Sequence, residues 1–288
     1  MFPRRRATRP VGVGGKRMTA PVLEVHGLRK EFGDLVAVDD VSFSVPPARS
    51  LALVGESGSG KTTIARMIVG LERPTAGQIT ACGTDRSKPS RSARVRRRRG
   101  REVQIVFQDP YTSLDPRQSA EQAVAEILRL HLDLPADRRR HRVAELVELV
   151  GLDERQAGAL PGALSGGQRQ RVAIARALAA EPRLLILDES VAALDVSIQA
   201  QVLNLLADIR DQTGVSYILI SHDLAVVRQL TEETIVLRRG RVVERGGTAQ
   251  VLDDPQHEYT RLLRASVPRP GWKPRRRRPD GRTETRQS

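Results

Sequence analysis

A glycine-rich segment, residues 55–62, places the strongest constraint on the fold, because it follows a short apolar run and precedes a helical pattern. Its sequence, Gly-Glu-Ser-Gly-Ser-Gly-Lys-Thr, fits the P-loop pattern of Gly, four residues and then Gly-Lys-Ser/Thr. Glycines allow the backbone torsions that direct successive N–H groups inward, and the N-terminus of the next helix adds positive potential. The segment therefore predicts a phosphate cradle between a buried strand and a helix.

The side chains within this loop indicate what the cradle would hold. The ammonium of Lys61 would add a point charge for the β- and γ-phosphates of a nucleotide, and the hydroxyl of Thr62 would bind Mg²⁺. A glycine- and serine-rich loop without a ligand is the alternative, and the flanking strand and helix disfavour it. The predicted nucleotide-binding residues of the loop are Gly55, Ser57, Gly58, Ser59, Gly60, Lys61, Thr62 and Thr63.

A second segment places two carboxylates after a buried strand. Residues 184–187 are Leu-Leu-Ile-Leu, and Asp188 and Glu189 follow directly. The carboxyl end of such a strand lies beside the P-loop, where Asp188 would hold Mg²⁺ through water and Glu189 would polarise an attacking water. A strand that merely ends in two acids at a turn is the alternative. Small-molecule kinases, GTPases, helicases and transport ATPases share the P-loop, and the acidic pair narrows this choice.

The hydrophobic pattern alternates between the periods of strands and helices. This alternation predicts an α/β fold with a mostly parallel central sheet, while residues 22–25 and 36–45 have the alternation of an antiparallel sheet. Two helical segments, interrupted at Pro135, are expected between residues 119 and 151. The other expected strands span 50–54, 78–81, 103–107, 184–187, 215–220, 234–237 and 242–244, and the other expected helices span 62–71, 169–180, 197–212 and a short stretch from 223.

A five-residue motif, Leu-Ser-Gly-Gly-Gln, ends 20 residues before Asp188. With this signature, the P-loop and the acidic strand, the chain resembles the ATP-binding cassette (ABC) ATPases over about residues 22–250. The resemblance implies a P-loop NTPase cassette with a RecA-like, mostly parallel sheet core, an antiparallel β subdomain and a helical subdomain at about 115–165. In this family the helix that the motif opens caps the ATP held by a second subunit, which implies a dimer with two composite sites. The signature residues are Leu164, Ser165, Gly166, Gly167 and Gln168.

Two further positions match catalytic motifs of the family. Gln108, after the strand at 103–107, matches the Q-loop glutamine that senses Mg²⁺ and the attacking water. His222, 33 residues beyond Glu189, matches the switch histidine that contacts the γ-phosphate, although a lone histidine after a strand is often a surface residue. The resemblance thus implies Glu189, His222 and Gln108 as catalytic residues. It also implies ATP as the nucleotide.

Two more matches concern the adenine and the dimer contact. Phe32 matches the aromatic residue that stacks on adenine, with an ordinary core phenylalanine as the alternative, and Asp195 matches the D-loop aspartate that communicates across the dimer. The family pattern Glu-Pro-Thr-Ser-Ala-Leu-Asp is Glu-Ser-Val-Ala-Ala-Leu-Asp at residues 189–195. The catalytic glutamate and the aspartate are kept, so the departure bears on communication between subunits and not on hydrolysis.

Two segments are similar to the oligopeptide/dipeptide (and nickel) permease ATPases. Residues 107–117 look like the Q-loop extension of that group, and residues 255–263 look like its His-Pro-Tyr-Thr extension, with Glu258 in place of the proline. An ordinary amphipathic helix is the alternative for the second segment. The resemblance implies an importer subunit at the cytoplasmic face of the membrane, with integral membrane permease subunits, a second ABC ATPase subunit in a heterodimer, and an extracytoplasmic solute-binding protein.

The charge distribution sets the remaining domain boundaries. The 288 residues carry a net charge of +14, and the excess lies in three segments: 1–20, 85–101 and 268–288. We expect disordered basic ends at 1–20 and 269–288, the cassette at 21–250 and the permease-type extension at 251–268. Residues 94–101 are expected to form a solvated basic loop, with a contact to lipid headgroups or a partner as the alternative.

Composition also bears on competing functions. The single cysteine, Cys82, excludes an internal disulfide, and no apolar run approaches the ~20 residues of a membrane-spanning helix. Aromatic residues make up only 3% of the chain, which disfavours base stacking and specific nucleic-acid binding. A non-transport ABC ATPase acting on nucleic acid or ribosomes remains the alternative that the basic ends suggest. A regulatory protein with an inactive ATPase site is the second alternative, and the complete set of catalytic positions argues against it.

Overall fold

The computed structural model describes residues 20–108, 114–191 and 194–265. Its centre is a six-stranded sheet in the order β10-β9-β3-β8-β7-β6. The strands are β3 (Ser50–Val54), β6 (Val103–Val106), β7 (Leu184–Asp188), β8 (Ser216–Ile220), β9 (Glu233–Arg238) and β10 (Arg241–Gly247). Neighbours from β9 to β6 are parallel, and β10 joins β9 as an antiparallel hairpin. The predicted α/β fold with a mostly parallel sheet is confirmed.

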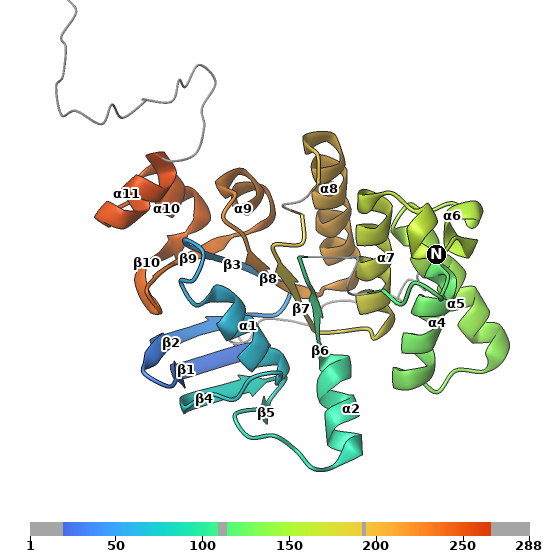
Figure 1. Cartoon of the computed structure of the whole chain (residues 1–288), viewed down its shortest axis with the longest axis horizontal. Helices are drawn as coiled ribbons and strands as arrows, with labels where there is room; N and C mark the ends of the chain where they lie inside the picture. Colours follow the sequence, from blue (N-terminus) through green and yellow to red (C-terminus); the bar gives the residue numbers. More distant parts are fainter. Residues whose placement is uncertain (1–19, 109–113, 192–193, 266–288) are drawn as a thin grey trace, which may run out of the picture.

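A second, antiparallel sheet has the order β2-β1-β4-β5. It consists of β1 (Leu23–Phe32), β2 (Leu35–Val45), β4 (Ala76–Ala81) and β5 (Thr84–Asp85). Helix α1 (Lys61–Val69) shares one hydrophobic cluster with this sheet and with one face of the central sheet. Figure 1 shows α1 between the two sheets, so the helix that follows the P-loop is held on both sides.

The opposite face of the central sheet is covered by helices. Helices α7 (Gly166–Ala179), α8 (Val196–Thr213) and α9 (Leu224–Leu230) share the second hydrophobic cluster with that face. The strands supply both clusters by alternation: Tyr217 and Leu219 of β8 belong to this one, and Ile218 and Ile220 belong to the cluster around α1. Such strands are buried on both faces, which explains why their sequences are continuous apolar runs.

A group of helices extends from this layer (Figure 1). It contains α4 (Ala120–His131), α5 (Ala136–Leu149), α6 (Glu154–Gly158) and a short 3₁₀ helix, η1 (Pro161–Ala163). Capping boxes at Ser119 and Asp153 begin α4 and α6. The chain ends its described part with α10 (Thr248–Asp253) and α11 (Glu258–Ala265), which lie beside the β9–β10 hairpin.

The prediction of a solvated loop at residues 94–101 is wrong, because this segment belongs to helix α2 (Ala93–Glu102). Ser92 caps the helix by accepting a hydrogen bond from the Val95 N–H. The buried Arg86 guanidinium fixes the other end, where it donates to the Arg99 carbonyl (2.9 Å) and to the Glu102 carboxylate (2.6 Å). Arginine has a high helix propensity, but the prediction from the sequence took the run of charged residues as a sign of a solvated loop.

Several boundaries also differ from the sequence-based expectation. Helix α7 begins at Gly166 and not at residue 169, because Ser165 caps it. Strand β1 continues to Phe32, where the sequence indicated an end near residue 25. The predicted disordered ends and residues 109–113 of the Q-loop extension lie outside the described residues, and the domain boundaries stay predictions.

Candidate functional site

The phosphate loop has a backbone that only glycine permits at two points. Gly55 has a φ of +151° and Gly60 a φ of +103°. A Cβ atom on Gly55 would lie 2.2 Å from the Leu237 carbonyl oxygen, and one on Gly60 would lie 2.6 Å from the Ala37 carbonyl oxygen. The loop is thus pressed against β9 on one side and β2 on the other. At Gly58, by contrast, a Cβ atom would meet nothing within 4 Å, so this part of the loop borders open space.

Lys61 is the first residue of α1, and its side chain turns back into the loop. Its ammonium Nζ donates to the carbonyl oxygens of Gly55 and Glu56, both at 2.8 Å, and the side chain is almost fully buried. Burial lowers the pKa of Lys61, and the nearby carboxylates of Glu189 and Asp188 oppose that shift. The lysine is therefore a desolvated cation held in place by backbone oxygens, the arrangement that favours a phosphate group as its next partner.

Two oxygen-bearing side chains meet beside the lysine. The hydroxyl of Thr62 on α1 donates to the Oδ1 atom of Asp188 at the end of β7 (3.2 Å). Asp188 is 5% exposed, and burial raises its pKa, with the neighbouring Glu189 charge adding to the effect. A carboxylate that is costly to bury and a hydroxyl beside it are hard oxygen donors of the kind Mg²⁺ takes. The residues present fit the predicted magnesium site, and the structure brings Thr62 and Asp188 together as expected.

The predicted catalytic glutamate and histidine also lie close together. Glu189 follows β7 and has a φ of +47°, and its backbone N–H donates to the carbonyl oxygen of Ile220 (2.9 Å). His222 follows β8, and its Nδ1 atom lies 3.6 Å from the Oε1 atom of Glu189. Since β7 and β8 are parallel neighbours, their carboxyl ends deliver both side chains to one edge of the sheet. The histidine side chain is 60% exposed, so its face toward solvent is open to a ligand.

The signature segment forms the N-terminus of α7. The Ser165 hydroxyl accepts from the Gln168 N–H (3.3 Å), and the Gln168 side chain accepts from the Ser165 N–H (2.8 Å). A Cβ atom on Gly167 would lie 2.4 Å from Cγ2 of Ile198 on α8, so a larger residue here would force the Ile198 side chain to shift. Helices α1 and α7 belong to the clusters on opposite faces of the central sheet. The signature and the P-loop therefore begin helices that belong to different hydrophobic layers of the chain.

The other predicted residues lie at element ends. Phe32 ends β1 with 44% of its surface exposed, and the Lys30 ammonium lies 4.5 Å from its ring centroid. Gln108 is exposed just beyond β6. Asp195 is exposed and caps α8, where its Oδ1 accepts from the Ile198 N–H (3.4 Å). The exposed aromatic fits a stacking surface better than the core position that was its alternative.

Sequence reasoning missed one residue at the loop. The Tyr259 hydroxyl on α11 accepts a hydrogen bond from the Glu56 N–H (3.0 Å), although 203 residues separate the two. No local pattern in the sequence could have revealed this contact. The sequence indicated only that residues 255–263 belong to a family-specific extension.

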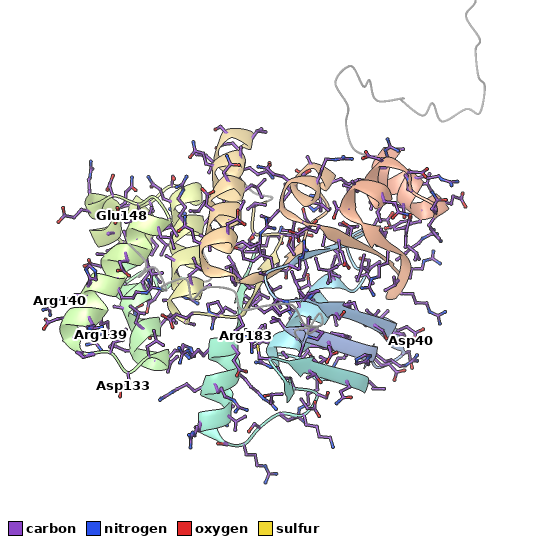
Figure 2. All side chains as sticks on the ribbon, turned by 180° about the vertical axis from the view of Figure 1, so that it is seen from behind. Asp40, Asp133, Arg139, Arg140, Glu148 and Arg183 are labelled. Atoms are coloured by element: carbon purple, nitrogen blue, oxygen red, sulfur yellow. The ribbon has the colours of Figure 1, made fainter. Side chains whose placement is uncertain are left out.

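A surface cavity of about 650 Å³ lies apart from these residues, between α4, α5 and α6. Its apolar lining includes Val143, Val147 and Leu152, and charged side chains stand at its rim. Two of these, Arg140 and Glu148, are labelled in Figure 2 on α5. Within the described ranges, no helix combines the length and the apolar character needed to cross a bilayer.

Comparison with known proteins places this geometry in a family. The family model described as ABC transporter matches residues 38–192. A protein of Brucella abortus, provisionally named as a peptide import ATP-binding protein, is 49% identical over 245 residues, which cover 84% of this chain and 73% of the relative. The dipeptide transport ATP-binding protein DppF of Haemophilus influenzae is 41% identical over 259 residues, covering 86% of this chain and 79% of the relative.

A solved structure adds a view of the assembled state. A dimeric ATP-binding cassette in a post-hydrolysis state, bound to ADP and phosphate, aligns with a TM-score of 0.70 and 28% sequence identity. The alignment covers 78% of this chain and 98% of that one. This match confirms the cassette fold that the motifs predicted.

Proposed function

This chain belongs to the ABC transporter family, and from that premise we propose that it is the ATP-hydrolysing subunit of an importer for di- or oligopeptides. One observation carries the chemistry: Lys61, Thr62, Asp188, Glu189 and His222 converge at the carboxyl edge of β7 and β8. The named relatives, which are peptide or dipeptide import subunits, support the choice of cargo.

In this proposal the phosphate loop holds the β- and γ-phosphates of ATP against the Lys61 ammonium. Glu189 orients a water molecule toward the γ-phosphate and accepts its proton, while Lys61 and His222 stabilise the charge that develops on the phosphate oxygens. Gln108, beyond β6, reaches the same edge and monitors the metal and the water. Phe32 stacks on the adenine ring.

The magnesium site that we propose consists of the Thr62 hydroxyl, Gln108 and, through water, Asp188. A bound Mg²⁺ would supply neutralisation of phosphate charge. The raised pKa of Asp188 supports this assignment, because burial disfavours the charged carboxylate and a bound cation would offset that cost.

A second subunit completes each site in this proposal. Helices α1 and α7 lie on opposite faces of the sheet, and in this proposal the Ser165 end of α7 meets the P-loop of another chain. Asp195, exposed at the start of α8, contacts the partner next to the signature. We propose that the partner is a related ABC ATPase, because peptide permeases of this group often pair two different ones.

The remaining partners follow from the importer assignment. We propose that this chain binds integral membrane permease subunits from the cytoplasmic face. A short permease helix could bind in the cavity between α4, α5 and α6, because the lining of this cavity combines apolar side chains with charged ones such as Arg140 and Glu148. An extracytoplasmic solute-binding protein would deliver the peptide to the permease and would choose the cargo.

The test is a tagged pull-down of the full chain from detergent-solubilised membranes, with the retained proteins identified by mass spectrometry. The proposal predicts two multi-span permease subunits and a second cassette ATPase. Recovery of nucleic acid or ribosomal proteins alone would overturn it and would support a non-transport ABC ATPase instead. An untagged strain processed in parallel identifies non-specific binding.

A further inference from the structure

We propose that Tyr259, on the C-terminal helix α11, is a positioning residue for the phosphate loop. This inference rests on the proposed ATPase function and adds to it a residue that none of the nucleotide motifs contains. Its hydroxyl oxygen accepts from the Glu56 N–H at 3.0 Å, so a segment more than 200 residues away touches the second residue of the loop.

The peptide unit that Tyr259 contacts is also the anchor of Lys61. The Glu56 N–H and the Gly55 C=O belong to one planar peptide unit and point in opposite directions. The N–H donates to the tyrosine, and the C=O accepts from the Lys61 Nζ atom (2.8 Å). Holding the N–H therefore fixes the direction of the carbonyl that holds the catalytic ammonium.

A restraint on this peptide unit matters, because glycine precedes its C–N bond and lacks the side chain that would resist a turn of the unit. Gly55 has a φ of +151°, a conformation that only glycine adopts readily, and glycine rotates with little penalty. A turn of the unit would aim the Glu56 N–H elsewhere and would withdraw one of the two carbonyl anchors of Lys61. The tyrosine hydroxyl removes that freedom before a nucleotide arrives, which lowers the entropic cost of binding.

The tyrosine itself is fixed by its surroundings. Its side chain is 3% exposed, and the Arg238 guanidinium of β9 lies 4.8 Å from its ring centroid. The N-terminus of α11 is fixed to β10, where the Glu244 carboxylate accepts from the backbone N–H groups of Gln256 (2.7 Å) and His257 (3.1 Å). The hydroxyl is thus presented by a rigid support.

The β9–β10 hairpin supports the same loop from the adjacent side. The Gly240 N–H donates to the Ser59 carbonyl (3.1 Å), and the hairpin's Arg238 lies over the Tyr259 ring. Helix α11 and the β9–β10 hairpin therefore each form a hydrogen bond with the backbone of the loop. We infer that it sets the affinity for phosphate without touching the nucleotide.

The experiment compares Tyr259→Phe with the wild-type full chain in two ways: by titration of each chain with ADP, and by steady-state ATPase kinetics after co-expression of each chain with the complete transporter. We expect the Kd for ADP and the KM for ATP to rise about 5- to 20-fold, with kcat within about twofold, because the hydroxyl acts equally in the ground state and the transition state. Unchanged Kd and KM would overturn the proposal.

A matched control separates positioning from simple stabilisation. Tyr217 on β8 donates its buried hydroxyl to the Leu206 carbonyl (2.8 Å) in the core and does not contact the loop. Tyr217→Phe removes the same atom from a buried hydrogen bond, so it should lower the Tm and leave the Kd for ADP unchanged. An equal rise of Kd in both variants would mean that any core hydroxyl has this effect, and that result would contradict the proposal.

Two further comparisons keep the result unambiguous. Tyr259→Leu also removes the ring from the core, and it should lower the Tm further than Tyr259→Phe while giving a similar rise in Kd among folded molecules. If the wild-type chain bound no ADP and hydrolysed no ATP, the proposed ATPase function would fail. If the wild type is active and Tyr259→Phe equals it, only the role of Tyr259 fails.

Discussion

Glu189 is held in a backbone conformation that few non-glycine residues adopt, with a φ of +47°. Its backbone N–H is fixed to Ile220 of the neighbouring strand, and its carboxylate lies 3.6 Å from the His222 ring nitrogen Nδ1. Such strain persists where surrounding contacts impose it and is common at functional sites. At this position it directs the carboxylate away from the strand and toward the edge of the sheet, where the γ-phosphate would lie.

The first prediction concerns Glu189→Gln. An amide cannot accept the proton of the attacking water, so we expect ATP hydrolysis to fall at least 100-fold while ATP binding is kept and the closed dimer accumulates. Turnover is measured as phosphate release, and bound ATP by filter retention. Unchanged turnover would contradict the role assigned to Glu189.

A control for this change is Glu233→Gln. Glu233 is an exposed carboxylate on β9 that forms an ion pair with Arg245 (3.5 Å). The substitution removes the same charge far from the loop, and exposed ion pairs contribute only about 0–1 kcal/mol to stability. We expect normal turnover from this variant.

The residues of the candidate site differ in how far the sequence could predict them. Lys61, Thr62 and Asp188 were predictable because each lies in a short motif whose spacing is set by one strand and one turn. Tyr259 was not predictable, because its contact with Glu56 depends on how α11 packs after 203 intervening residues. Residues that act together within a short motif can be recognised from the sequence, whereas a contact from a distant segment can be found only in the complete fold.

At the scale of elements, Asp39 joins three strands near the back of the phosphate loop. Its carboxylate accepts from Arg29 of β1 and from the Arg241 Nε atom of β10 (2.7 Å), and its backbone N–H donates to the Gly240 carbonyl (2.9 Å). The hydrogen bond from Arg241 is the largest cause of a lowered pKa at Asp39. Above its ordinary carboxyl pKa, this group therefore stabilises the junction of β2 with the hairpin.

The second prediction follows from the sign of that shift. Because the folded-state pKa is lowered, the contribution of Asp39 is fully present above the unfolded value of 3.8 and is lost as the pH falls through the lower folded value. We expect Asp39→Asn to lower the Tm by a few degrees at pH 7. The difference between wild type and variant should shrink as the pH is lowered below 3.8.

The neighbouring residue supplies the control for this prediction. Asp40, labelled in Figure 2, is exposed and has a φ of +53°, which asparagine also tolerates. Asp40→Asn should leave the Tm nearly unchanged at both pH values. A difference for Asp39→Asn that stays constant from pH 7 to pH 3 would exclude the ion-pair explanation.

Helix α2 shows the limit of composition as a guide to elements. Its arginines divide into two groups that the sequence cannot separate. Arg99 donates to the carbonyls of Lys88 (2.8 Å) and Asp85 (2.7 Å), whereas Arg97 and Arg98 are exposed. Arg86, which precedes the helix, acts with the first group because it donates to the Glu102 carboxylate. At the C-terminal end of the helix, the Arg183 backbone N–H donates to the Glu102 carbonyl (3.0 Å), and Figure 2 labels Arg183 beside this end.

The third prediction separates these two groups. Replacing Arg97 and Arg98 by Gln should change ATP turnover by less than about twofold and the stability by less than about 0.5 kcal/mol, because the side chains are solvated. Arg86→Gln should destabilise the chain by about 2–4 kcal/mol, because it leaves Glu102 without its buried partner. Denaturant unfolding and phosphate release measure the two effects. Loss of turnover in the Arg97/Arg98 variant would instead assign this helix a part in catalysis.

At the scale of the whole molecule, the two motifs that we propose to form a shared ATP site belong to helices on opposite faces of the central sheet. The P-loop begins the helix packed on one face, and the signature begins a helix packed on the other. The motifs predicted this fold class and its mostly parallel central sheet, because apolar runs and glycine turns specify strands locally, whereas the strand order required the complete fold. The sequence departs from the family pattern at residues 190–192, before Asp195, and it does not indicate which second chain meets this surface.

The last prediction tests whether that second chain is a copy of this one. Lys61→Ala disables the site that uses this chain's P-loop, and Ser165→Arg blocks the site that uses its signature. In a heterodimer, each variant keeps one intact site, and a mixture of the two performs as the average of the separate variants. In a homodimer, each variant loses both sites, but half of the dimers in an equal mixture regain one, so that about a quarter of the wild-type sites return. We expect the heterodimer result when both variants are co-expressed with the complete transporter and phosphate release is measured in membranes. Two differently tagged wild-type copies should likewise fail to co-purify. Recovery of both tagged copies together, with restored turnover in the mixture of variants, would show that the chain pairs with itself.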